Sequence, residues 1–304
     1  MRKILKCILL VAAITLAFSF NNAAYAETVS KSDFNSILLN KGYTEYEIAK
    51  MSDRVKEKLA SSSGEKANYT VEMTEYYNSP EGKRIEVTNE NKKFIREKMR
   101  EDAIKYSKKH DISVMDIPTP IEVDSANVQS TNEGISTYGV GDSHVDNKLL
   151  FSVWIQKYAL SSTSVWYTTE LDFQWGGFPS FTFTDSIALA WDNKFTGDAS
   201  SLQKYFYLSL DNSKPLHSAM STSQSIYGYS GKFQAYPSLM WGGLSQEVTA
   251  PKSQIGNPGK FQAKYVHSFM PFSGSVSLGP ASVDVPATWT SQEFELNLNI
   301  GIGN

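Results

Sequence analysis

Hydrophobic and polar residues alternate with a period of two through most of the second half of the chain. Apolar side chains share one phase over residues 165–175, and the pattern recurs at 181–191, 206–210 and 294–300. Such alternation is typical of strands with one buried face and one face in solvent. Nine or ten segments of this kind, separated by Gly-Gly, Asn-Pro-Gly and Ser-Gly turn signals, predict a mainly β fold: an antiparallel β-sandwich over residues 148–304, favoured over a barrel.

The region before it, residues 27–110, shows helical spacing and predicts a small α+β module. Thr44 and Glu47 have the spacing of a capping box, which satisfies backbone N–H groups at a helix start. One helix is expected to follow, with an apolar stripe of Ile48, Met51, Val55 and Leu59. A shorter helix is expected before it, ended by Gly42, and a hairpin after it around the turn signal at residues 78–82.

A charged helix from about Asn89 to His110 is expected to close this module. Its predicted inward side chains are Phe94, Ile95, Met99, Ala103 and Ile104. Basic residues between positions 92 and 100 are interleaved with acidic ones, so a solvated surface of mixed charge is favoured over a partner-binding or propeptide-like role.

Residues 111–147 predict a polar linker between two regions of different composition. This segment contains Pro118, Pro120 and several glycines, with little periodic apolar content. Arginine is absent after residue 120, whereas all six tryptophans lie between Trp154 and Trp289. A change of charge and aromatic content at the same place is typical of a domain boundary.

Residues 1–26 have the pattern of a secretory signal peptide. Three basic residues precede an apolar run over residues 8–20, and the small residues Ala24 and Ala26 mark an expected cleavage site after Ala26. The run is shorter than the roughly twenty residues that span a bilayer. The protein is therefore expected to be secreted, and removal of Cys7, the only cysteine, leaves no disulfide and no thiol nucleophile.

Composition and motifs argue against several function classes. The formal net charge of −3 does not suggest a nucleic-acid partner. The chain lacks a Gly-x-Ser-x-Gly elbow, a phosphate-binding loop, a dinucleotide fingerprint and a His-Glu-x-x-His motif, so no cofactor is expected. The pairs Glu170/Asp172 and Glu293/Glu295 fall on the solvent phase of their strands, whereas a glycosidase needs two carboxyls that face each other across a sugar. A carboxylate hydrolase is the least favoured function.

Three further polar features have structural explanations. Asp185 falls on the apolar phase of its strand, which indicates either a β-bulge or a buried carboxylate held by hydrogen bonds. His267 is expected to be a hydrogen-bonded structural residue. The alternating donors Asp142, His144 and Asp146 could meet one metal ion, but they lack the glycine and distal glutamate of a calcium loop and also fit a polar linker end.

Aromatic residues supply the candidate ligand-binding surface. Several rings break the strand phase or flank turns, and rings in such places can stack on sugars or lie at a lipid interface. The candidates are Trp166, Tyr227, Tyr229, Tyr236 and Trp241. They predict a secreted, non-enzymatic binding protein with an extracellular glycan or protein ligand.

The alternative is a membrane-active protein, either a β-pore-forming toxin or a bacteriocin-like protein. In residues 218–230, small hydroxyl residues alternate with Met220, Ile226 and tyrosines. This composition resembles that of strands that cross a membrane by closing a ring. The oligomeric state stays open.

Overall fold

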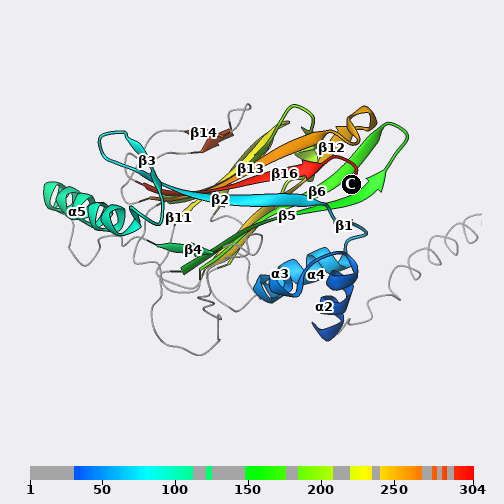
Figure 1. Cartoon of the computed structure of the whole chain (residues 1–304), viewed down its shortest axis with the longest axis horizontal. Helices are drawn as coiled ribbons and strands as arrows, with labels where there is room; N and C mark the ends of the chain where they lie inside the picture. The colour runs from blue at the N-terminus through cyan, green and yellow to red at the C-terminus, as the bar shows by residue number, and fades with distance from the viewer. Residues whose placement is uncertain are drawn as a thin grey trace, which may run out of the picture.

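The computed structural model describes residues 31–111, 121–124, 148–175, 184–207, 220–234, 240–268, 276–278, 283–285 and 291–304. Their strands form two seven-stranded sheets that pack face to face, with three short helices against one outer face and a longer helix at one end (Figure 1). The prediction of a mainly β, antiparallel fold is confirmed. The predicted signal peptide, most of the predicted linker and the metal candidates Asp142, His144 and Asp146 lie outside the described residues.

Sheet A has a central run of long antiparallel strands. Its order is β1 (Glu65–Lys66), β5 (Lys148–Leu160), β6 (Ser164–Trp175), β12 (Trp241–Pro251) and β8 (Thr196–Gly197). In addition, β4 (Glu122–Asp124) pairs in parallel with β5, and β9 (Gln203–Tyr207) pairs with β12. Short 3₁₀ helices occur at Ala199–Ser201 and Lys252–Gln254.

Sheet B is antiparallel throughout. Its order is β10 (Met220–Ser225), β11 (Gly228–Gln234), β7 (Thr184–Trp191), β13 (Pro258–Ser268), β16 (Ser291–Gly301), β2 (Tyr69–Asn78) and β3 (Arg84–Val87). A two-stranded sheet of β14 (Val276–Leu278) and β15 (Val283–Val285) contacts β7, β10 and β11.

Strands from the first third of the chain are part of both large sheets. Strand β1 pairs with β5 in sheet A, and β2 pairs with β16 over its whole length in sheet B. The change of composition near residue 120 therefore does not coincide with a break in either sheet.

The core between the sheets is aromatic. The apolar phase that the sequence predicts on β6 is buried there, with Leu171 and Phe173 fully inaccessible to solvent. Phe173 stacks on Phe233 of the opposite sheet, with ring centroids 4.5 Å apart and planes 5° apart. This stacking joins β6 and β11 across the sandwich.

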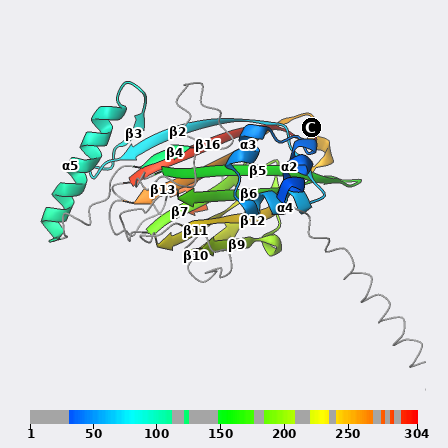
Figure 2. The same cartoon turned by 90° about the horizontal axis from the view of Figure 1, so that it is seen from below.

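Three short helices cover the outer face of sheet A (Figure 2): α2 (Lys31–Asn40), α3 (Glu45–Lys50) and α4 (Asp53–Ser61). The predicted capping box is present at the start of α3, where the Thr44 N–H donates to Glu47 Oε2 at 2.9 Å. The prediction of one continuous helix is wrong, because the backbone at Met51 is extended and Ser52 caps a new helix through the Val55 N–H.

Helix α5 (Lys92–His110) projects from the other end of the sandwich (Figures 1 and 2). It packs through Ile95 and Met99 against Tyr77 of β2. The predicted inward positions of Phe94 and Ile104 are wrong: these side chains are 66% and 37% exposed, because Arg96 occupies the inward face instead. Among the described residues, no helix is long and apolar enough to span a membrane.

Candidate functional site

The structure does not bring the five candidate aromatics together. Tyr229 is fully buried in the core and donates to the Leu244 carbonyl at 3.3 Å. Trp241 is 5% exposed, whereas Trp166 and Tyr227 are partly exposed. Tyr236 lies outside the described residues.

Trp241 belongs to an aromatic cluster beneath α4, on the outer face of sheet A. Its ring stacks on Tyr207 at 4.1 Å, with the planes 7° apart. The Arg54 guanidinium of α4 lies 4.6 Å from the centroid of the Tyr205 ring and donates to the Tyr207 hydroxyl at 2.9 Å. Helix α4 thus occupies the face that an external ligand would need.

The same helix covers Glu170 and Asp172, whose predicted exposure to solvent is wrong. These carboxyls are 1% and 3% exposed. Lys58 of α4 forms an ion pair with Glu170, and the Tyr205 hydroxyl donates to Asp172 Oδ1 at 2.7 Å. Burial raises the pKa of Asp172 to about 8, although the hydrogen bond from Tyr205 acts in the opposite direction. Because one helix covers both groups, the pair does not face an open cleft.

The second carboxylate pair, Glu293 and Glu295, is also buried, contrary to the prediction. Lys264 donates to both carboxylates, at 2.7 and 3.0 Å, and Arg84 contacts both at 2.6 Å. These cations hold the pKa of Glu293 below its usual value even though burial acts to raise it. Each carboxylate is therefore neutralised as part of a structural network.

Asp185 is a buried carboxylate held by hydrogen bonds, one of the two alternatives that the sequence left open. The register of β7 with β11 is continuous across this position, from Thr184 to Ala190, so no bulge is present in that pairing. Three groups surround the carboxylate: the Tyr265 hydroxyl at 2.6 Å, His267 Nδ1 at 3.1 Å and the Ser268 N–H at 3.2 Å.

The Asp185–His267 pair is closed to solvent. The two residues are 0% and 1% exposed, and the Trp175 indole packs 5.5 Å from the imidazole ring. A carboxylate only accepts hydrogen bonds, so the contact with Asp185 assigns a hydrogen to His267 Nδ1. This arrangement fits the predicted role of His267 as a hydrogen-bonded structural residue.

Strand β10 offers a different kind of surface, because it is an edge of sheet B. Residues 221–224 are all exposed, and the segment from 218 to 230 has neither charged residues nor proline. Soluble proteins commonly protect such edges with charges, proline or bulges, because an unprotected edge pairs with other strands. Here the β10–β11 register is continuous from Met220 to Ser225.

Hydrogen-bond geometry shows which backbone groups of β10 point outward. The Trp191 N–H donates to the Tyr227 carbonyl, so alternate residues of β11, beginning with Gly228, face β10. Their partners are residues 221, 223 and 225, which leaves the N–H and C=O of Thr222 and Gln224 directed away from the sheet. Met220 belongs to the same alternating set as Thr222 and Gln224, and its carbonyl also points away from β11, since it accepts a 2.7 Å hydrogen bond from Lys204 Nζ. In the part of the chain that the structure describes, no strand pairs with this side of β10.

The turn after β10 adds an apolar contact. Ile226 is 50% exposed, while its carbonyl is held by the Gly197 N–H at 2.8 Å and by the Trp191 indole at 3.0 Å. We call the outward backbone of Thr222 and Gln224, together with Ile226 and Tyr227, the β10 edge. Of the predicted aromatics, Tyr227 belongs to it.

Comparisons with known proteins give no sequence relative and only low-scoring structural matches. No protein-family model and no curated protein sequence match this chain. Solved structures that align with parts of the chain include two collagen-binding domains, from the Enterococcus faecalis surface protein ACE and the Erysipelothrix rhusiopathiae surface protein RspB. The ACE domain is 8% identical, with a TM-score of 0.27, and the alignment covers 44% of this chain and 88% of that domain. The RspB domain is 4% identical, with a TM-score of 0.29, and the alignment covers 48% of each chain.

A third structure is the Clostridium perfringens NetB toxin in its membrane-inserted form. It aligns with 8% identity and TM-score 0.26 over 50% of this chain and 90% of that one. TM-scores this low do not establish a shared fold.

Proposed function

We propose that this protein is a secreted, non-enzymatic binding protein that captures an extended segment of a protein ligand at the β10 edge. The observation that carries the proposal is an exposed, uncharged edge strand whose outward N–H and C=O groups are directed away from the sheet. Adding a strand to such an edge is a common mode of peptide recognition, in which main-chain hydrogen bonds supply affinity and side-chain contacts supply specificity.

A polypeptide fits this surface better than a glycan does. Thr222 and Gln224 present donors and acceptors at the repeat of a β-ladder, which a second backbone matches. A glycan would need an exposed aromatic platform, whereas Tyr229 and Trp241 are buried and Trp166 and Tyr227 are only partly exposed. At the end of the strand, the exposed side chain of Ile226 offers an apolar contact to the added segment.

Pore formation through residues 218–230 is the less favoured function. Strand β11 is hydrogen-bonded on both sides, to β10 and to β7, and Met220 and Tyr229 pack in the core. Insertion of this hairpin would require removal of an interior strand from sheet B. Strand addition requires no such rearrangement.

Replacing Thr222 with proline is expected to weaken peptide binding at least about tenfold, because proline removes an outward N–H without removing a ladder hydrogen bond. The probe is a displayed library of random peptides, selected on the wild-type protein and then titrated against each variant. Amide hydrogen exchange at Thr222 and Gln224 should slow when a selected peptide binds.

Two variants control for this experiment. Thr222→Val keeps the N–H and should bind like the wild type, whereas Ser223→Pro removes a hydrogen bond to β11 and should lower stability. Selected peptides that bind Thr222→Pro as well as the wild type, or a library that yields no binder, would contradict the proposal. Self-association that Thr222→Pro abolishes would replace the foreign ligand with a second copy of the chain.

A further inference from the structure

We propose that α5 is a docking site for the surface of a bilayer that contains anionic phospholipids. This site is separate from the β10 edge, since it lies on the helix that projects beyond the sheets (Figures 1 and 2). Its ligand is a set of lipid phosphates rather than a polypeptide segment.

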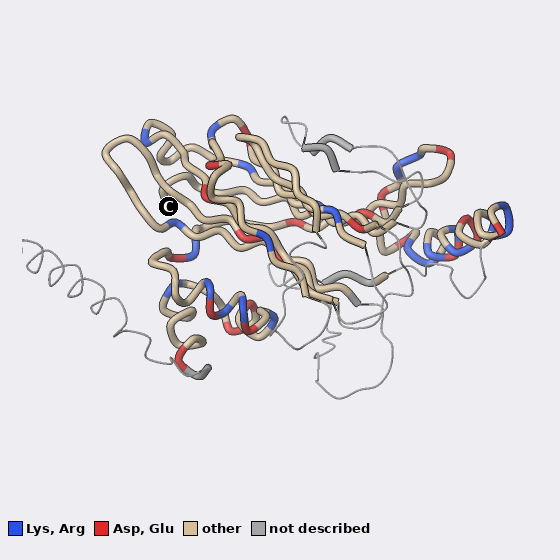
Figure 3. The backbone as a smooth tube through the Cα atoms, turned by 180° about the vertical axis from the view of Figure 1, so that it is seen from behind, with Lys and Arg blue, Asp and Glu red and all other residues tan. Residues whose placement is uncertain are grey.

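The exposed charge of α5 is mainly positive, although the whole chain has more acidic than basic residues. The helix contains eight Lys and Arg residues and three acidic residues, and basic residues occur along its whole length (Figure 3). The exposed bases are Lys93, Arg100, Lys105, Lys108 and Lys109, and the exposed acids are Glu97 and Glu101. Basic residues near an anionic bilayer each add to the attraction.

Arg96, Lys98 and Asp102 of α5 are paired within the protein. Arg96 is 8% exposed and forms a two-pronged ion pair with Glu75 of β2, so it fixes the helix to the sheet. Asp102 accepts hydrogen bonds from the Tyr77 hydroxyl at 2.6 Å and from Lys98 at 3.0 Å. Internal pairing therefore removes Asp102 from the exposed face and leaves that face with an excess of positive charge.

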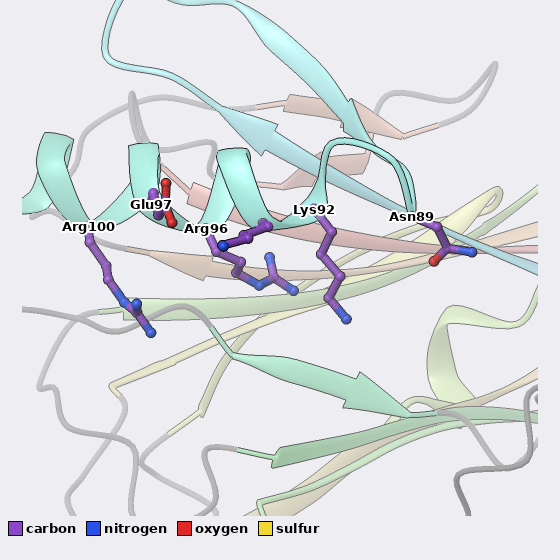
Figure 4. Close-up of a pocket in the computed structure, with 6 residues that line it drawn as sticks. Asn89, Lys92, Arg96, Glu97 and Arg100 are labelled. Carbon is purple, nitrogen blue, oxygen red and sulfur yellow. The ribbon is translucent and has the colours of Figure 1, made fainter.

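An open depression of about 480 Å³ lies along one flank of the helix. It is lined by Asn89, Lys92, Lys93, Arg96, Glu97 and Arg100. In Figure 4, Lys92 and Arg100 extend to the same side of α5, with Arg96 between them. Besides Arg96, which is paired with Glu75, the lining contains the cations Lys92, Lys93 and Arg100 and one carboxylate, Glu97, so positive charge exceeds negative charge around the depression.

Phe94 favours a bilayer over a soluble polyanion as the ligand. It is 66% exposed and follows Lys93 directly in the chain, and Ile104, one turn beyond Arg100, is 37% exposed. An exposed aromatic ring beside basic residues can enter the boundary between headgroups and acyl chains while the bases contact lipid phosphates. A soluble phosphate polymer would leave Phe94 without a role.

The test is sedimentation of the protein, residues 27–304, with phosphatidylcholine vesicles that contain or lack phosphatidylglycerol. The protein should bind only the anionic vesicles and should be released by salt, because salt screens the attraction. Lys93→Glu with Arg100→Glu should reduce partitioning roughly tenfold or more, and Phe94→Ala should reduce it several-fold.

Matched controls test whether vesicle binding depends on α5 rather than on the overall charge or the exposed apolar side chains of the protein. Lys252→Glu with Lys260→Glu makes the same change of charge at exposed positions away from α5, and Leu39→Ala removes an apolar side chain that is 44% exposed on α2. These variants, and Thr222→Pro, should bind vesicles like the wild type. All the changed α5 side chains are exposed, so circular dichroism should stay unchanged.

Three results would overturn the inference. The first is that the protein does not bind anionic vesicles. The second is that Lys93→Glu with Arg100→Glu and Lys252→Glu with Lys260→Glu reduce vesicle binding equally. The third is that the protein binds soluble polyphosphate but not vesicles. The last result would identify a soluble polyanion as the ligand. None of these outcomes affects the strand-addition experiment, which uses peptides and no lipid.

Discussion

Replacing Asp185 with alanine is expected to lower the free energy of unfolding by about 4 kcal/mol. The carboxylate accepts from the Tyr265 hydroxyl, from His267 Nδ1 and from the Ser268 N–H, all of them buried. Alanine would leave three donors without an acceptor in a site closed to water, and each such donor costs about 1–3 kcal/mol. Urea unfolding followed by tryptophan fluorescence measures the change, because Trp175 packs beside His267.

Two variants set the scale for this loss. Asp185→Asn keeps one acceptor oxygen and nearly the same volume, so it should destabilise the fold less than alanine does. Asp192→Ala removes a more exposed carboxylate that accepts from the Lys194 and Lys260 backbone N–H groups, and it should lower stability by about 1 kcal/mol. A loss below about 1 kcal/mol for Asp185→Ala would show that the network is not a main support of the core.

Replacing Asp172 with asparagine is expected to change how stability depends on pH. The pKa of Asp172 is raised from 3.8 to about 8 in the folded protein, so between these values the native state keeps a proton that the unfolded state loses. The wild type should therefore lose stability as pH rises from about 4 to about 8, by up to about 1.4 kcal/mol per pH unit, with no further loss above that range. Asparagine cannot ionise, and its amide oxygen can still accept from Tyr205.

The measurement is the free energy of unfolding of both proteins at several pH values. The free energy of unfolding of Asp172→Asn, relative to that of the wild type, should increase up to about pH 8 and then stay constant. Tyr205→Phe removes the hydrogen bond that lowers the Asp172 pKa, so it should extend the sloping range to higher pH. Parallel pH profiles for the wild type and Asp172→Asn would show that Asp172 is not protonated in the native state at neutral pH.

Sequence periodicity predicted which side of β6 faces the core but not the environment of its other side. Leu171 and Phe173 are buried as expected, yet Glu170 and Asp172 are also buried. Alternation identifies an apolar face, whereas burial of a polar face depends on partners elsewhere in the chain. Here those partners come from α4 and β9, and no local pattern links these elements to β6.

The two proposed binding surfaces depend on features that no local pattern determines. The composition of residues 218–230 was visible in the sequence, but β10 is an edge only because of the order of strands in sheet B. For α5, helical spacing could not distinguish Phe94 from Ile95 as the inward residue. The ion pair between Arg96 and Glu75 fixes the rotation of the helix and places Phe94 outside.

The pairing of β2 with β16 affects how the chain folds and how it behaves after cleavage. Asn78 and Ser291 are register partners although 213 residues separate them. Sheet B cannot be completed until the last strand has been synthesised, and contacts between residues so distant in sequence slow folding. Once formed, the ladder holds residues 69–78 against residues 291–300, so a chain cut between residues 125 and 147 should yield two fragments that stay associated until a denaturant separates them.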